Sequence, residues 1–257
     1  MHTSTYSDSR NATNWNGVQF ADGTEFDSFI TNEITPRLHD EIGKAEFTAH
    51  LKSLASTGFA QDNLQAILDA EHPEERDWAV GEALAEAWLS REHGVIWPWN
   101  MERDKRTSQA SLPGADLVGF VTQGSETRLA LGEVKSSSDK GTPPNVMTGR
   151  KGMTRQLENL ATDVGLLHTL LRWLQPRCRG NSTEPHFNAA IKLLLQSGAI
   201  TLFGVLVRDT QPDEHDLRSR GQHLGGIVNA PAGCHLLALY LPCSIASLPA
   251  RISSGVS

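Results

Sequence analysis

The chain has 257 residues, of which 39% are hydrophobic and 21% are charged, a balance that is ordinary for a globular protein with a buried core. No apolar run approaches the roughly 20 residues of a membrane-spanning helix, and the polar start of the chain lacks a signal-peptide pattern. A cytoplasmic protein without membrane contact is therefore expected. Residues 1–101 carry a net charge of −11 and residues 102–180 a net charge of +4. Only the middle section thus has the local basicity that phosphate binding requires.

The sequence suggests three sections. Residues 1–16 are polar and are expected to be disordered. Residues 17–73 are expected to form an acidic mixed α/β extension, with a strand near 18–23 followed by helical stretches. Pro73 marks its end. Residues 74–257 are expected to form the main domain, which opens with a long helix that ends near Gly94.

The main domain then changes to short apolar segments bounded by turn residues, which are typical of strands. The peptides SLPG and QGSE separate three such segments, so antiparallel neighbours are easy to form. The expected strands are 95–101, 115–122, 127–137, 199–209 and 234–243, the expected helices are 153–175 and 186–198, and the expected loops are 136–152 and 210–222. This order predicts an α+β fold, an α/β sandwich in which helices flank a mixed central sheet.

The three cysteines contain no CxxC pair. Cys234 and His235 are adjacent, which suits opposite faces of one strand better than two ligands of one zinc ion. Core packing is the expected role for this pair.

Two acidic residues and a lysine carry the chemistry. Glu133 and Lys135 are two positions apart on one expected strand, so their side chains share a face. Asp116 lies on the preceding strand, which can bring its carboxylate beside Glu133. Two carboxylates and a backbone carbonyl, that of Val134, form the hard oxygen site that Mg²⁺ favours. The alternative is an exposed ion pair on an edge strand, but the apolar neighbours of Glu133 favour a buried strand.

These residues resemble the PD-(D/E)XK nuclease superfamily, in which an acidic residue on one strand precedes (D/E)xK on the next. Here they read Pro113-Gly114-Ala115-Asp116 and Glu133-Val134-Lys135, and the resemblance covers about residues 74–209. It implies a restriction-endonuclease-like core and Mg²⁺-dependent hydrolysis of phosphodiester bonds, with Mn²⁺ as a substitute. The metal would activate water, and Lys135 would orient that water and stabilise developing negative charge.

The resemblance implies two further site residues. A helix before the first strand commonly supplies a glutamate to the metal in this superfamily. Glu82 lies at the margin of the apolar stripe of that helix and is favoured over Glu86, which is expected further toward solvent. In some branches the helix after (D/E)xK carries a glutamine, and Gln156 occupies that place. Leu160 replaces the aromatic residue that usually follows four positions later, and the alternative for Gln156 is a polar residue near a helix start.

Basic residues near the motif are expected to meet the phosphates of DNA, although charged loop residues are more often only solvated. They are Lys140, Arg150, Lys151 and Arg155 after the motif, and Arg103, Lys105 and Arg106 before it. Trp97 and Trp99 are candidates for stacking on a base, but packing is the commoner role of tryptophan in a core strand.

The general layout is also similar to nuclease effectors of bacterial anti-phage systems, of which the nuclease subunits of Hachiman-type systems are one group. That resemblance implies a nuclease that acts on DNA with a helicase (ATPase) partner, and the acidic first 101 residues would then dock the partner or restrain activity. The alternatives are a catalytically inactive subunit that binds nucleic acid or acts as a scaffold, and a restriction-type endonuclease. The residues do not distinguish DNA from RNA or endonuclease from exonuclease, and they leave the oligomeric state open.

Overall fold

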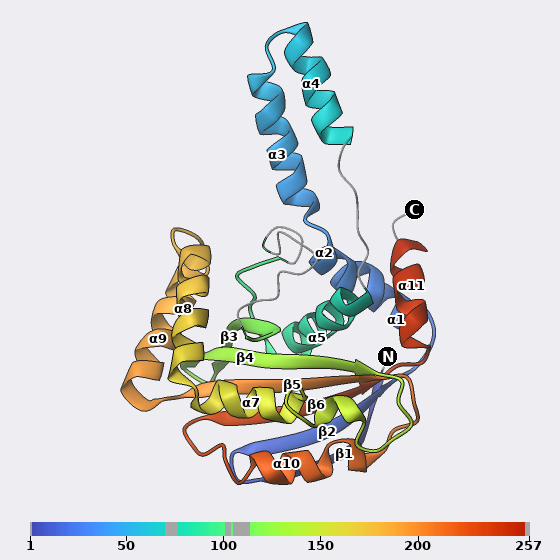
Figure 1. The fold of residues 1–257 in the computed structure, drawn as a ribbon, viewed down its shortest axis with the longest axis vertical. Coiled ribbons are helices and arrows are strands. Elements are labelled where there is room, and N and C mark those ends of the chain that lie inside the picture. The colour runs from blue at the N-terminus through green and yellow to red at the C-terminus, as the bar shows by residue number, and fades with distance from the viewer. Residues whose placement is uncertain (1, 70–76, 101–103, 105–113, 255–257) are drawn as a thin grey trace.

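The computed structural model describes residues 2–69, 77–100, 104 and 114–254, and its centre is one sheet of six strands in the order β1-β2-β6-β5-β4-β3 (Figure 1). The expected α+β fold with a mixed sheet flanked by helices is confirmed. The strands are β1 (His2–Arg10), β2 (Thr13–Phe20), β3 (Leu117–Gln123), β4 (Glu126–Ser137), β5 (Ile200–Arg208) and β6 (Gly233–Tyr240). Strands β4, β5, β6 and β2 run parallel to one another, and the two outer strands β1 and β3 run antiparallel to β2 and β4.

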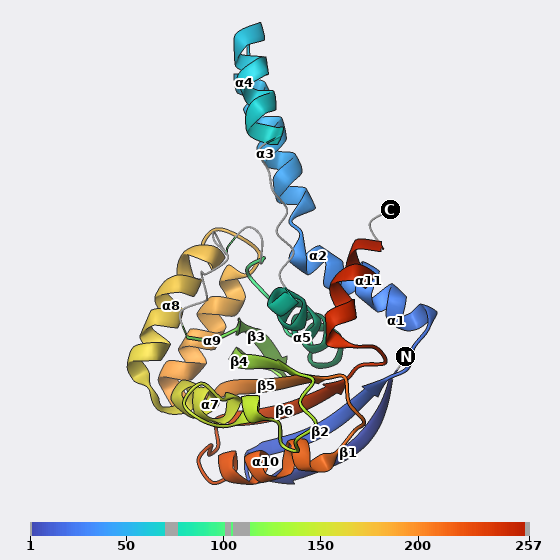
Figure 2. The same cartoon turned by 45° about the vertical axis from the view of Figure 1, so that its right-hand side comes forward.

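Helices cover both faces of the sheet, as parallel strands require. Figures 1 and 2 show α5 with α1, α2 and α11 on one face, and α7 and α10 on the other. The helices are α1 (Thr24–Phe29), α2 (Thr35–Leu38), α3 (Glu41–Leu54), α4 (Gly58–Asp69), α5 (Asp77–His93), α7 (Met153–Thr162), α8 (Val164–Cys178), α9 (Glu184–Ser197), α10 (Arg218–Leu224) and α11 (Leu248–Ser254). Every residue of β5 is buried, which places the core on both sides of this central strand.

The expectation that residues 1–16 are disordered is wrong, because β1 and the start of β2 form the edge of the sheet. Almost every side chain of β1 is exposed, so this strand has no apolar alternation from which to predict it. Its backbone ladder with β2 holds it in place, together with a 2.9 Å hydrogen bond between the hydroxyls of Tyr6 and Tyr240. Since β2 pairs with β6, the expected extension 17–73 and the expected domain 74–257 share one sheet.

Three other expected elements differ from the structure. Of the expected strand at 95–101, Ile96 forms an isolated bridge to Phe120, because Pro98 has no N–H to donate. The expected helix at 153–175 divides into α7 and α8 at Asp163, whose carboxylate caps α8 by accepting from the Leu166 N–H at 3.0 Å. The expected loop at 210–222 contains most of α10.

Helices α3 and α4 form an arm that projects away from the sheet, as Figures 1 and 2 both show. Polar and small residues separate the apolar positions of both helices, and large apolar side chains stand exposed along the arm. These are Ile42, Phe47, Leu54, Phe59 and Ile67. Exposed apolar groups of this size, concentrated on one element, are typical of a surface that contacts another molecule.

Candidate active site

The hairpin of β3 and β4 positions the candidate residues. A two-residue turn at Gly124 and Ser125 joins the strands, and the pairing runs from Gln123 with Glu126 to Leu117 with Gly132. The Asp116 N–H extends this ladder by donating to the Gly132 carbonyl at 3.0 Å. Asp116 therefore lies opposite Glu133, at the point where β4 continues beyond its partner strand.

The structure brings Asp116, Glu133 and Lys135 together. Oδ2 of Asp116 accepts a 2.9 Å hydrogen bond from the Val134 N–H, which fixes this carboxylate against β4. Glu133 and Lys135 form an ion pair through Oε1 and Nζ. Since the N–H and C=O of one strand residue point to the same side, the Val134 carbonyl is directed toward the Asp116 side of β4.

Glu133 lies under α7. Gly204 of β5 is its neighbour in the sheet, and a Cβ at Gly204 would lie within 2.9 Å of Leu157 and Met153 of α7. The glycine thus lets α7 approach the sheet and enclose the carboxylate. The Glu133 side chain is 1% exposed and the Lys135 side chain is 23% exposed, so the pair is open to solvent only on the lysine side.

Burial and the adjacent Asp116 carboxylate raise the pKa of Glu133 to about 8, although Lys135 opposes the shift. Within the described part of the chain, Glu133 Oε2 is buried and has no hydrogen-bond partner. A buried carboxylate oxygen in this state is destabilised until a cation or a donor reaches it.

This shift predicts how the stability of the metal-free protein depends on pH. The folded pKa of Glu133 lies above its ordinary value of 4.5, so its contribution is complete below pH 4.5 and declines until the pH passes about 8. Glu133→Gln is expected to remove this decline and to stabilise the protein at pH 9 by at least about 1 kcal/mol relative to pH 5. Urea unfolding in EDTA at both pH values measures the difference. Equal changes for wild type and variant would contradict the assigned environment.

Two glutamates of α5 were candidates for the site, and the structure buries both of them. Gly81 packs against β4, because a Cβ there would lie 2.5 Å from Ser136 Oγ. Glu82 is 9% exposed, and Glu86 is the more deeply buried of the two at 2%. The expectation that Glu86 points toward solvent is wrong, because Arg37 of α2 lies over it at 3.8 Å. In the described residues, no three acidic, histidine or cysteine side chains gather into a metal-binding cluster, and the role of Glu82 in the site stays a prediction.

Gln156 lies on α7, the helix that covers Glu133. Its neighbour Leu157 contacts the sheet beside Glu133. Its Oε1 atom is buried, without a hydrogen-bond partner among the residues described. The glutamine therefore presents an unused acceptor on the helix that encloses the candidate site, and its role in the site stays a prediction.

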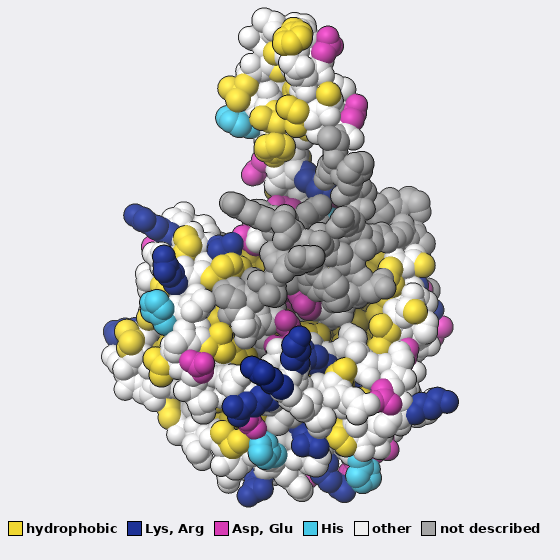
Figure 3. Space-filling model, in the orientation of Figure 1, with side chains coloured by type: hydrophobic (Ala, Val, Ile, Leu, Met, Phe, Trp, Pro, Cys, Tyr) yellow, Lys and Arg dark blue, Asp and Glu magenta, His cyan; other side chains and the backbone are white. Residues whose placement is uncertain are grey.

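The basic residues after the motif lie on the surface near the start of α7. Lys140, Arg150, Lys151 and Arg155 are exposed, and Figure 3 shows Lys and Arg side chains gathered on this face of the molecule. A hollow of about 360 Å³ lies here, and α10 contributes Arg220 and His223 to its wall. The sequence pattern missed these two residues because their helix was interpreted as a loop. Arg103, Lys105 and Arg106 lie outside the described residues.

The set of donors fits a small divalent cation. Asp116, Glu133 and the Val134 carbonyl offer only oxygen atoms, which hard cations such as Mg²⁺ prefer. The buried, unpartnered Oε2 of Glu133 has the strongest requirement for a positive neighbour. The residues present could hold such an ion with water and a phosphate oxygen completing its coordination.

No protein-family model and no curated protein sequence matches the chain. In the part of the chain that the structure describes, no helix is long and apolar enough to cross a membrane.

Proposed function

We propose that this protein is a Mg²⁺-dependent nuclease that hydrolyses phosphodiester bonds in DNA. The observation that carries the proposal is the convergence of Asp116, Glu133 and Lys135 on two adjacent strands, with Glu133 fully buried. A surface ion pair would leave both charges in water, where it would add little stability. Here one carboxylate is enclosed beside another, an arrangement that is unfavourable for folding and favourable for binding a cation.

The carboxylates and the lysine would have different roles in the reaction. A bound Mg²⁺ supplies a Lewis acid and lowers the pKa of a coordinated water. Asp116 and Glu133 hold the ion, and the Val134 N–H orients the Asp116 carboxylate. Lys135, which is partly exposed, faces the solvent side of the site. Its ammonium group orients the attacking water and stabilises negative charge as it develops on the phosphate.

The basic surface near α7 supports binding of a polyanion. Arg150 and Lys151 are exposed and precede the helix that covers Glu133. Their guanidinium and ammonium groups would neutralise backbone phosphates and release counterions, so binding should weaken as salt rises. This positions the backbone without reading its sequence.

Replacing Arg150 and Lys151 together by serine is expected to reduce the slope of log affinity against log salt by about 2. Fluorescence anisotropy with a labelled DNA in EDTA, at several salt concentrations, measures the slope without cleavage. The matched control is Lys52→Ser with Lys192→Ser, on the arm and on α9, which removes the same number of exposed cations. An equal loss of slope in both double variants would assign binding to net charge alone.

The proposal includes a defence role with a helicase partner, as the similarity in layout implies. Two features of the arm support contact with a protein rather than with DNA. Phe47, Leu54 and Ile67 are exposed, and residues 41–69 contain four acidic side chains and two lysines. This surface attracts apolar groups and repels phosphates.

The direct test is to incubate the protein with single-stranded DNA, duplex DNA and RNA of the same sequence in Mg²⁺ or in EDTA. DNA is expected to be cut in Mg²⁺ alone. RNA cut in preference to both forms of DNA would contradict the proposed substrate, and cutting in EDTA would contradict the metal.

A further inference from the structure

The hollow of about 360 Å³ between α7 and α10 has walls from three separate segments. The loop before α7 contributes Arg150, the helix α7 contributes Arg155 and Glu158, and α10 contributes Arg220 and His223. Three guanidinium groups and one carboxylate therefore line the hollow, so its net charge is +2 when His223 is neutral. An excess of positive charge inside a concave surface attracts an anion.

Glu158 does not neutralise the whole hollow, because both of its oxygen atoms already have partners. Oε2 accepts a hydrogen bond from Arg155 Nη1 at 2.8 Å, and Oε1 lies 2.6 Å from His223 Nε2. The Glu158 side chain is only 17% exposed. These three side chains thus form a fixed network along one wall, in which the carboxylate balances the charge of Arg155.

Arg150 and Arg220 carry the remaining positive charge. Arg220 is partly buried, and its Nε atom is buried without a hydrogen-bond partner among the residues that the structure describes. Arg150 is exposed, and neither guanidinium group forms an ion pair with the described part of the chain. A partly buried charged group without a partner is destabilised until an acceptor reaches it.

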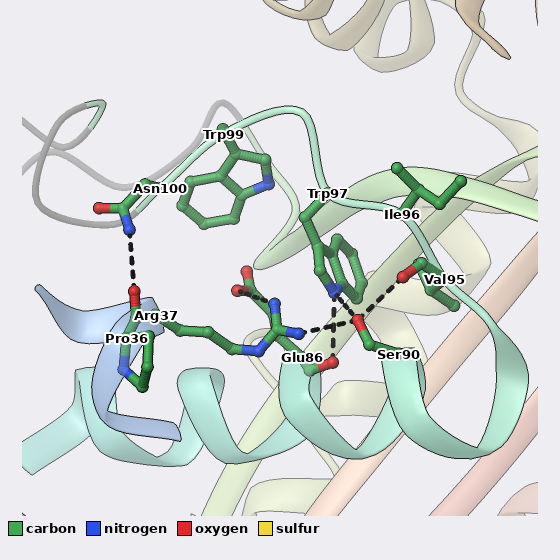
Figure 4. A pocket seen from close by; sticks show the side chains of 9 residues that line it. All are labelled: Pro36, Arg37, Glu86, Ser90, Val95, Ile96, Trp97, Trp99 and Asn100. Carbon is green, nitrogen blue, oxygen red and sulfur yellow. Dashed lines mark hydrogen bonds and ion pairs between the residues drawn. The ribbon is translucent and has the colours of Figure 1, made fainter. Parts of the chain in front are cut away.

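The cavity of about 320 Å³ on the α5 face shows the opposite arrangement (Figure 4). There Arg37 donates to Ser90 Oγ at 2.9 Å, and its guanidinium group faces the Glu86 carboxylate at 3.8 Å. The charge of that arginine is therefore balanced within the protein. The hollow beside α7 differs because it keeps two guanidinium groups available for a ligand.

The charge and the geometry of the hollow favour a phosphate monoester over other anions. A carboxylate, and a phosphodiester within a nucleic-acid strand, each offer two free oxygen atoms and one negative charge. A terminal phosphate offers three acceptor oxygens and a charge of about −1.5 to −2 at pH 7. Two free guanidinium groups on different walls match this larger charge, and each can bond two phosphate oxygens at once.

We propose that the hollow binds the terminal phosphate of a nucleic-acid strand. Arg220 donates to it from α10 and Arg150 from the loop before α7, while Arg155 remains paired with Glu158. The choice of a nucleic-acid ligand rests on the proposed nuclease function. The proposal adds a preference for strands whose ends are phosphorylated.

Helix α7 joins the hollow to the candidate active site. Its Leu157 packs against Gly204, which is the neighbour of Glu133 in the sheet. Glu158, the next residue of the helix, lines the hollow. A strand end in the hollow is therefore bound beside the same helix that covers the buried carboxylate.

Binding in EDTA tests the proposal without cleavage. The probes are single-stranded DNA oligonucleotides of one sequence with an internal label, and they carry a 5′-phosphate, a 3′-phosphate or hydroxyl groups at both ends. Fluorescence anisotropy is measured at pH 8, where the terminal phosphate is a dianion. One phosphorylated end is expected to tighten binding at least about tenfold, since a hydrogen bond to a charged group commonly contributes this much.

Arg220→Gln is expected to reduce this gain in affinity to less than about twofold. Its matched control is Arg218→Gln on the same helix, which removes an arginine that is already paired with Glu214 at 2.7 Å and should keep the gain. Arg150→Gln changes an exposed side chain, so it should lose the gain without disturbing the fold. Inorganic phosphate, added as a competitor, should remove the gain of the wild type.

A gain from either phosphorylated end supports the proposal and identifies the terminus that is bound. Equal affinity of the wild type for phosphorylated and hydroxyl ends would overturn it, as would a gain that survives in both folded variants, Arg220→Gln and Arg150→Gln. Binding of inorganic phosphate without any gain from a phosphorylated end would assign the hollow to free phosphate and overturn the strand end as its ligand.

Cleavage in Mg²⁺ is measured in parallel with the same probes. Cutting without any effect of the terminal phosphate on binding removes the phosphate site and keeps the nuclease. Tighter binding of phosphorylated ends without cutting keeps the phosphate site and removes the nuclease.

Discussion

Lys135→Ala is expected to slow Mg²⁺-dependent cleavage of DNA by about 10²–10³-fold, the usual loss when one group that stabilises transition-state charge is removed. The variant keeps both carboxylates, and it removes a cation that pairs with Glu133. Binding of Mg²⁺ is therefore expected to be retained. Cleavage rates at saturating DNA, together with titration calorimetry of Mg²⁺, separate the two effects.

The matched control for this prediction is Lys192→Ala, which removes an exposed lysine of α9. It should cut DNA at the wild-type rate. If Lys135→Ala also retained the wild-type rate, Lys135 would be only a structural partner of Glu133. If it lost Mg²⁺ binding along with cleavage, its role would be to arrange the metal site rather than to stabilise charge.

Asp216→Ala is expected to lower the free energy of unfolding by about 3–5 kcal/mol, because it leaves the charge of Arg208 buried and unpaired. Arg208 is 1% exposed and Asp216 is fully buried. Their side chains are joined at 3.2 Å, and the Tyr240 hydroxyl lies 3.0 Å from the same carboxylate oxygen. Urea unfolding at neutral pH measures the loss.

The effect should extend to the candidate active site. Arg208 donates to the carbonyls of Ser137, Asp139 and Gly141, at 3.1, 2.6 and 3.2 Å. It thereby fixes the loop that follows Lys135. The control is Arg218→Ala, which breaks an exposed pair with Glu214 on the adjacent helix and should change stability by less than about 1 kcal/mol. Similar losses of unfolding free energy in the two variants would show that the buried pair contributes no more to stability than the exposed pair.

Elements with strong local signals were predicted well from the sequence. The hairpin of β3 and β4 followed from two apolar segments around a short polar turn, and it set Asp116 opposite Glu133. The apolar runs of β5 and β6 likewise indicated strands. In each case the residues of one segment contain the information, because burial on a sheet imposes its own pattern.

Features that depend on distant partners were not predicted. Strand β1 is polar on both faces and is specified by its backbone ladder with β2. Glu86 is buried because Arg37, from a helix 49 positions earlier, covers it. Asp216 was placed in a surface loop because it is charged, yet Arg208 and Tyr240 enclose it. Hydrophobic periodicity indicates which face of an element is apolar. It does not indicate which charged residue, distant in the sequence, neutralises a buried charge.

Cleavage of supercoiled, linear and single-stranded DNA by the wild type and by Glu133→Gln, in Mg²⁺ and in EDTA, tests the nuclease most directly. The variant preserves the size of the side chain and removes its charge, so a folded protein with an altered site is compared with the native one. We predict Mg²⁺-dependent cutting by the wild type and none by Glu133→Gln. Cutting that persists in the variant, or no cutting of any of these DNAs by the wild type, would contradict the assigned site and function.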